Sequence, residues 1–147
     1  MMFGEEIENE IKEFINRTEN IYYFPDSDYG VEYLNNNFRF LGTKIDLSKE
    51  KNYVSYDFKK NNFLDMMKFF EFKDIKENIL ASNEIHYVGD GITNSELVFS
   101  GKEFFKLLEF LFVNIPEHHY FFDMEKKWCL LIATEGWIDY GEKSIEI

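Results

Sequence analysis

The segment from Ser100 to Pro116 constrains the fold most, because its apolar residues follow the period of an α-helix. Apolar residues recur there at intervals of one or three positions, at Phe104, Leu107, Leu108, Leu111 and Phe112. Ser100 and Glu103 have the spacing of a capping box, and Pro116 disfavours helical geometry at Ile115. We therefore predict a helix that begins at Ser100, ends before Pro116 and buries one face against another layer.

Short β-type segments surround this helix. The expected strands are residues 84–88, 96–99, 119–122, 128–133 and 137–140. We expect the first of them to end at Gly89, and residues 123–127 have the length of a hairpin connection. Gly136 is interpreted as a turn or a bulge before the last strand.

The N-terminal half is expected to add further helices. Residues 3–17 and 62–72 place apolar side chains on one helical face, and a shorter helix is expected at 72–80. Asn62 is interpreted as an N-cap, with Asp65 three positions later.

Residues 20–58 are harder to interpret. They suggest β-type residues at 21–24, a turn at 25–28, a loop or helix end at 35–37, and half-buried strands at 38–41 and 53–58.

These elements predict an α+β fold, with an antiparallel sheet on which an N-terminal helix and two or more further helices pack. The length of 147 residues fits a single domain spanning 1–147. Aromatic residues make up 19% of the chain, and buried aromatic rings give even a short chain a substantial core.

The charge of the chain bears on its partners. With 28 acidic and 16 basic residues, the formal net charge is −12. Such a surface repels phosphate backbones and anionic membranes, so we expect no nucleic-acid or membrane partner. It attracts basic proteins, although the same acidity also serves plain solubility.

The compartment is expected to be the cytosol. The N-terminus has no basic start followed by an apolar signal core, and the apolar stretches are too short to span a membrane. Cys129 is the one cysteine, which fits a reducing compartment, and its apolar neighbours place it in the core.

Motifs for catalysis, metals and cofactors are missing from the sequence. His118 and His119 are adjacent and should point to opposite faces of a strand, and no zinc-ligand spacing occurs. No nucleophile elbow or phosphate-binding glycine loop is present. We therefore expect no catalytic residues, no metal and no cofactor, and interpret the chain as a binding protein rather than an enzyme.

A larger pattern spans roughly residues 83–141. The segments Tyr87–Asn94, Ile115–Phe122, Trp128–Leu131 and Glu135–Gly141 resemble a pattern in immunity proteins of bacterial polymorphic-toxin and contact-dependent growth inhibition systems. This resemblance implies a cytosolic protein without turnover that binds the toxic domain of a cognate effector, often a nuclease. A nuclease is basic where it grips phosphate, which an acidic partner complements.

The predicted partner contacts are acidic residues near turns together with two aromatic anchors. They are Asp26, Asp28, Asp90, Glu135 and Asp139, with Trp137 and Tyr140. Solvated surface charge is the alternative for the acidic residues, and core packing is the alternative for the two rings.

Two other functions stay open at this stage. One is a phage-type protein inhibitor of a host nuclease, which needs the same acidity. The other is a small hydrolase in which a cleft joins His119 to the nearby carboxylates Glu135 and Asp139.

Overall fold

The computed structural model describes residues 3–42, 44–90, 93–133 and 135–143. The helices are α1 (Phe3–Asn16), α2 (Asp28–Asn37), α3 (Phe63–Met67), α4 (Lys73–Leu80) and α5 (Phe104–Asn114), with 3₁₀ turns η1 (Lys68–Glu71) and η2 (Gly101–Glu103). The strands are β1 (Tyr22–Phe24), β2 (Phe40–Leu41), β3 (Lys44–Ile45), β4 (Lys51–Asp57), β5 (Ile85–Asp90), β6 (Glu96–Phe99), β7 (His118–Asp123), β8 (Trp128–Ala133) and β9 (Trp137–Glu142).

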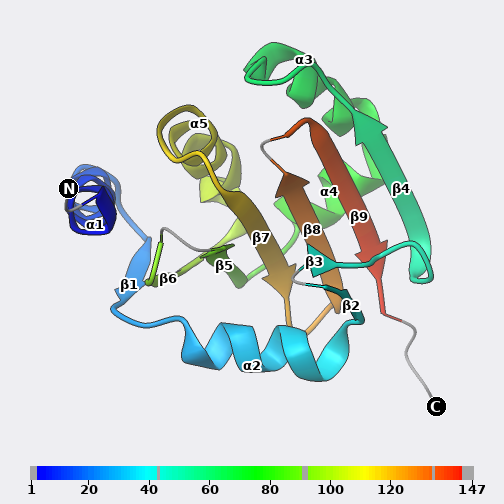
Figure 1. Ribbon diagram of the computed structural model, residues 1–147, viewed down its shortest axis with the longest axis horizontal. Helices are drawn as coiled ribbons and strands as arrows, with labels where there is room; N and C mark the ends of the chain where they lie inside the picture. The colour runs from blue at the N-terminus through cyan, green and yellow to red at the C-terminus, as the bar shows by residue number, and fades with distance from the viewer. Residues whose placement is uncertain (1–2, 43, 91–92, 134, 144–147) are drawn as a thin grey trace.

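Seven strands form one antiparallel sheet in the order β1-β6-β5-β7-β8-β9-β4. Strands β2 and β3 form a separate two-stranded ribbon. Figure 1 shows α1, α5 and α3 on one side of the sheet and α2 on the other. The predicted α+β fold with an N-terminal helix is therefore confirmed.

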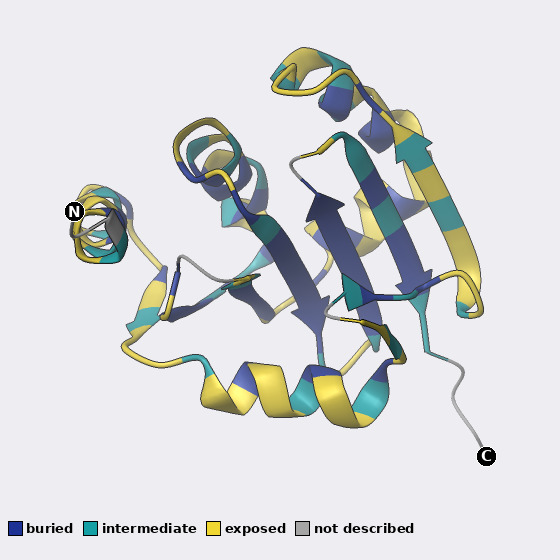
Figure 2. Ribbon diagram, in the orientation of Figure 1, coloured by how far each residue is buried: buried dark blue, intermediate teal, exposed yellow. Residues whose placement is uncertain are grey.

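Two hydrophobic cores lie on opposite faces of this sheet. On the helical face, Tyr87, Phe121 and Leu130 meet apolar side chains of α1, α3, α4 and α5. On the opposite face, which we call the α2 face, Phe122 and Leu131 meet Leu34, Phe38, Ile45 and Leu47. Figure 2 shows the central strands buried and the outer surface of α2 exposed.

Several predicted elements agree closely with the structure. The first helix, the strands of the C-terminal third and the β7–β8 hairpin lie where they were expected. The side chain of Asn62 accepts a 2.9 Å hydrogen bond from the backbone N–H of Asp65, which confirms the N-cap of α3. Helix α5 ends at Asn114, and Ile115 is extended before Pro116.

Helix α2 is the main correction. The sequence predicted a turn at 25–28 and a loop or helix end at 35–37, but residues 28–37 are helical. Three asparagines and a glycine give this segment a poor intrinsic helix preference. Contacts with the sheet stabilise the helix despite this low propensity. Leu34 is buried, and the ring of Tyr33 stacks on Phe122 with centroids 5.4 Å apart.

Smaller differences concern the ends of elements. Strand β5 continues through Gly89 to Asp90, because both residues pair with β7. Ser100 makes no side-chain capping bond, and a 3₁₀ turn precedes α5 in place of the predicted capping box. The helix expected at 62–72 changes to 3₁₀ geometry after Met67.

Two predictions about short segments are also refined. The strand expected at 38–41 contains only Phe40 and Leu41, and it pairs outside the main sheet. Gly136 lies in the turn between β8 and β9 with φ of +127°, a conformation that favours glycine.

Candidate functional site

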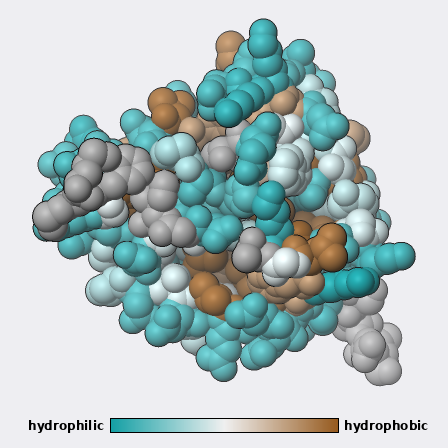
Figure 3. Space-filling model, viewed as in Figure 1, coloured by the Kyte–Doolittle hydropathy of each residue, from teal (hydrophilic) through white to brown (hydrophobic). Residues whose placement is uncertain are grey.

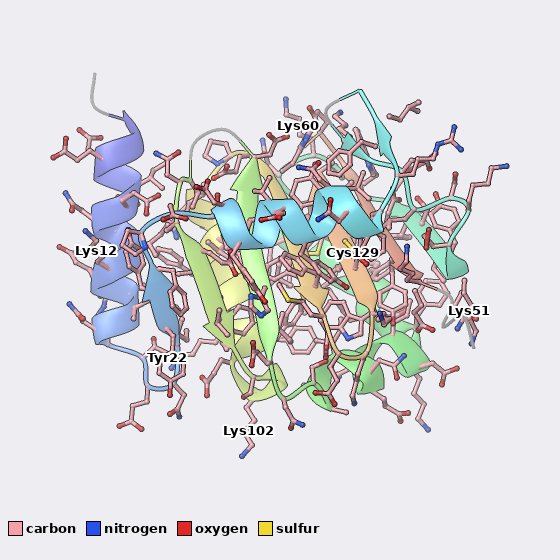
Figure 4. All side chains as sticks on the ribbon, turned by 90° about the horizontal axis from the view of Figure 1, so that it is seen from below. Lys12, Tyr22, Lys51, Lys60, Lys102 and Cys129 are labelled. Carbon is pink, nitrogen blue, oxygen red and sulfur yellow. The ribbon has the colours of Figure 1, made fainter. Side chains whose placement is uncertain are left out.

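A groove of about 960 Å³ opens on the α2 face of the sheet. Its walls come from β1, the start of α2, the start of β5, β6 and η2. Figure 4 shows α2 crossing the strands and leaving one end of the sheet open, where Tyr22 and Lys102 lie. A volume of this size is typical of sites that hold a small molecule or a few residues of a peptide.

The floor of the groove is a row of side chains across three strands. Tyr22 on β1 pairs with Val98 on β6, which pairs with His86 on β5, so all three residues share one face. Tyr22 is 63% exposed, and Tyr29 at the start of α2 is 67% exposed. Exposed aromatic rings gathered in a concave surface are characteristic of binding sites.

A buried carboxylate anchors the polar part of the groove. Glu96 is 3% exposed, and its Oε1 accepts a 2.8 Å hydrogen bond from the backbone N–H of Gly30. Its Oε2 lies 2.6 Å from Nδ1 of His86, and Nε2 of His86 lies 2.8 Å from Oε1 of Glu84. Because ionised carboxylates only accept hydrogen bonds, this geometry favours the doubly protonated imidazolium.

The charge state of His86 follows from competing effects. Burial by itself lowers the pKa of His86, but the hydrogen bonds and charges of Glu96 and Glu84 outweigh it, so the pKa is raised. The ring also stacks on Phe122, with centroids 5.4 Å apart. In this state His86 lacks the free nitrogen lone pair that a general base requires, so the arrangement is suited to binding.

The rim of the groove is acidic. Asp26, Glu84 and Glu103 line it together with the buried Glu96. Among the described lining residues, Lys102 carries the one positive charge besides that of protonated His86. The groove therefore keeps a net negative charge even when His86 is protonated.

One of the predicted contact residues, Asp26, lines this groove, and Asp28 follows it closely in the chain. Oδ1 of Asp26 accepts a 3.1 Å hydrogen bond from the backbone N–H of Asp28. Asp28 opens α2, where the helix dipole favours negative charge.

Four other predicted residues gather elsewhere on the α2 face. Nε2 of His118 donates a 2.6 Å hydrogen bond to Glu135, and Nδ1 lies 3.5 Å from Asp90. Trp137 lies beside His118 with ring centroids 6.2 Å apart, and Nζ of Lys44 sits 4.5 Å above the Trp137 ring. The hydrogen bond from His118 lowers the pKa of Glu135.

Asp139 belongs to the same region. Its Oδ1 accepts a 2.5 Å hydrogen bond from Ser55. Burial raises the pKa of Asp139, and the charges of Asp57 and Asp46 raise it further against the opposing effect of Ser55. We call Asp57, Asp90, Glu135 and Asp139 the acidic patch.

Tyr140 was wrongly predicted as an exposed anchor. It is 0% exposed and faces the helices, because it alternates with Asp139 along β9. Its hydroxyl donates a 2.7 Å hydrogen bond to Glu142 and accepts a 3.3 Å bond from Asn78. Core packing, the alternative interpretation, is correct for this ring.

The cleft expected for a hydrolase is not formed by the described residues. His119 is fully buried on the helical face, whereas Asp139 lies on the α2 face. Nε2 of His119 donates a 3.0 Å hydrogen bond to the carbonyl of Ile115, and Nδ1 of His119 accepts a 2.7 Å hydrogen bond from the Tyr87 hydroxyl. Burial lowers the pKa of His119 to about 4.

Sequence reasoning missed the groove itself. The sequence held one indication of it, because Glu96 and His86 are polar residues in strands that are otherwise mainly apolar. The pairing of β5 with β6, which joins these residues, is a tertiary feature that the sequence did not specify.

The described ranges offer few groups for metal binding or nucleophilic chemistry. Within them, no three His, Cys, Asp or Glu side chains converge in a way that could hold a metal ion. Burial raises the pKa of the Cys129 thiol, which makes it a poor nucleophile. No helix in these ranges combines the length and apolarity needed to cross a membrane.

Comparison with known proteins gives no relative: no family model, curated protein or solved structure matches the chain significantly.

Proposed function

We propose that this chain is a binding protein that captures a basic protein partner on the α2 face of its sheet. It acts without turnover, as an immunity protein does when it neutralises a cognate toxin domain in the cytosol. The groove and the acidic patch form the contact surface, and α2 lies between them.

The observation that supports this proposal most is the meeting of carboxylates with exposed or half-buried aromatic rings on one face. The opposite face of the sheet is covered by α1, α3, α4 and α5. On the α2 face, the acidic patch and the groove bring carboxylates close to Trp137, Tyr22 and Tyr29. Figure 3 shows a surface dominated by hydrophilic residues, with smaller hydrophobic patches among them.

Electrostatics gives this surface its preference for cations. Burial is the main cause that raises the pKa of Asp139, and the negative charges of Asp57 and Asp46 raise it further. A basic partner relieves the crowding of these charges, and complementary charge also speeds association. A nuclease domain, which is basic where it holds phosphate, has suitable chemistry.

The test begins with capture of the partner from the source cell and its identification by mass spectrometry. Affinity is then measured at rising salt for two variants that remove the same number of charges. Asp57→Asn/Asp90→Asn/Glu135→Gln alters the acidic patch, and Glu5→Gln/Glu6→Gln/Glu10→Gln alters exposed positions on α1.

We expect the patch variant to lose about tenfold or more in affinity and the α1 variant to change little. Expression of the partner alone should be toxic, and co-expression of this chain should restore growth. Equal loss in both variants, or affinity that salt does not weaken, would contradict binding through the α2 face.

A further inference from the structure

The groove has a surface chemistry that the acidic patch lacks. Tyr22, Phe24 and Tyr29 expose 63%, 49% and 67% of their surfaces, and all three line the groove. Around them stand the carboxylates of Glu84, Glu103 and Asp26, whereas the buried Glu96 is already bonded to Gly30 and His86. Aromatic rings with carboxylates at their edges form the type of surface that binds a cation carrying apolar bulk.

Within the described residues, no lysine or arginine side chain lies over a ring of the groove, and the protonated ring of His86 lies 6.3 Å from that of Tyr29. In the described part of the chain, the cation–π contacts lie elsewhere, with Lys12 over Tyr23, Lys44 over Trp137 and Lys76 over Phe105. Oε1 of Glu84 accepts the hydrogen bond from His86, and the Glu84 side chain is 66% exposed. Its second oxygen can accept a hydrogen bond from a ligand.

We propose that the groove receives an arginine side chain from an extended segment of the protein partner. The guanidinium stacks on the exposed rings of Tyr22 and Tyr29 and pairs with Glu84, while apolar neighbours of the arginine rest on Phe24 and Val98. This proposal rests on the proposed function, because it specifies the chemistry that the basic partner presents at one part of the α2 face.

Arginine fits this surface better than lysine for two reasons. Its planar guanidinium stacks on aromatic faces and forms paired hydrogen bonds with a carboxylate, whereas a lysine ammonium is compact and strongly hydrated. A volume of about 960 Å³ also exceeds the needs of one guanidinium, which leaves room for flanking residues of the segment.

The probe for this inference is the peptide acetyl-Leu-Arg-Leu-amide, compared with the same peptide carrying citrulline, the neutral isostere of arginine. Backbone amide shifts of the protein are followed by NMR as each peptide is added. We expect the arginine peptide to shift the amides of residues 22–29, 84–86 and 96–103, and to bind about tenfold more tightly than the citrulline peptide.

Two groove variants and one remote variant sharpen the test. Tyr29→Ala and Glu84→Gln replace exposed groups, so we expect both to fold and to weaken the arginine peptide several-fold. Tyr53→Ala removes an exposed ring on β4, outside the groove, and should leave binding unchanged. Thermal melts confirm that each variant is folded.

The inference would be overturned by equal affinity for the citrulline peptide, by shifts confined to the acidic patch, or by unchanged binding to Tyr29→Ala. A dimer in gel filtration that Tyr29→Ala dissociates would also overturn it, because the groove would then be an interface between copies. If the captured partner still depends on the acidic patch while the arginine peptide fails to bind, this inference is wrong and the proposed function stands. If the arginine peptide binds but the captured partner does not depend on the acidic patch, the arginine site stands and the proposed contact through the acidic patch is wrong.

Discussion

The buried carboxylate of Glu96 on β6 accepts a 2.8 Å hydrogen bond from the backbone N–H of Gly30 in the first turn of α2. The first N–H groups of a helix have no partner within it, and the side chain of Ser27 makes no capping bond here. A strand residue distant in sequence therefore supplies the cap. The same carboxylate holds His86, so one side chain joins α2, β5 and β6 at the wall of the groove.

Replacing Glu96 with alanine should lower the free energy of unfolding by about 3 kcal/mol, because it leaves His86 and the Gly30 N–H buried without their acceptor. Urea unfolding at pH 7 measures this change. Glu84→Ala is the matched control, since Glu84 bonds the same ring from an exposed position and should cost less than about 1 kcal/mol. Similar losses in the two variants would show that the Glu96 contacts contribute little beyond surface charge.

Replacing Gly30 with alanine should destabilise the protein by about 1–3 kcal/mol, although alanine is the better helix former. A Cβ at this position would lie 2.6 Å from Oε1 of Glu96 and 3.0 Å from Cζ of Phe122. Asn35→Ala, at an exposed position of the same helix, is expected to be neutral or slightly stabilising. A Gly30→Ala variant as stable as the wild type in thermal and urea unfolding would contradict this close approach.

The burial of His119 predicts a loss of stability in mild acid. Its pKa falls from the ordinary 6.5 to about 4 in the folded protein, so the unfolded chain takes up a proton first as the pH drops. The stability from neutral His119 is complete above pH 6.5 and decreases toward pH 4, by up to about 3 kcal/mol. Urea unfolding from pH 7 to 4.5 should show a shallower decline for His119→Gln than for the wild type, and parallel curves would refute the assignment.

His86 should behave in the opposite way. Its folded pKa is raised, so its stabilising contribution is complete below pH 6.5 and is lost as the pH rises through the folded pKa. NMR titration of the imidazole Cε1–H resonances should show that His86 loses its proton at a higher pH than an ordinary histidine. Glu84→Gln should lower that midpoint, because it removes one of the two carboxylates that stabilise the protonated His86 ring. An unchanged midpoint would contradict the contribution of Glu84 to the raised pKa.

Much of the fold could be predicted from the sequence, because those elements are determined by local sequence patterns. The pattern of Leu107, Leu108 and Leu111, stopped by Pro116, predicts α5 through helical period and proline geometry alone. The strands of the C-terminal hairpin are similarly marked by continuous apolar runs. Helix α2 was missed because its asparagines and glycine oppose helix formation, and contacts with Glu96 and Phe122 decide its state.

The candidate site was less predictable. Asp26, Asp28, Asp90, Glu135, Trp137 and Asp139 were chosen from turns and strands, and the structure places them at two regions of the α2 face. The burial of Tyr140 was not predicted, because the alternation of side chains along a strand defines two faces of the sheet without showing which face the helices cover. The Glu96–His86–Glu84 network could not be predicted from the sequence, because it depends on the register between β5 and β6.

By itself, the sequence determined the class of fold, most of its elements and a strong negative charge, because these follow from local periodicity and composition. The tertiary structure alone decided that α2 forms, which sheet face it covers and where carboxylates meet exposed rings. These features depend on strand order and register, which bring together residues as distant as Gly30 and Glu96, and no local pattern encodes such pairings.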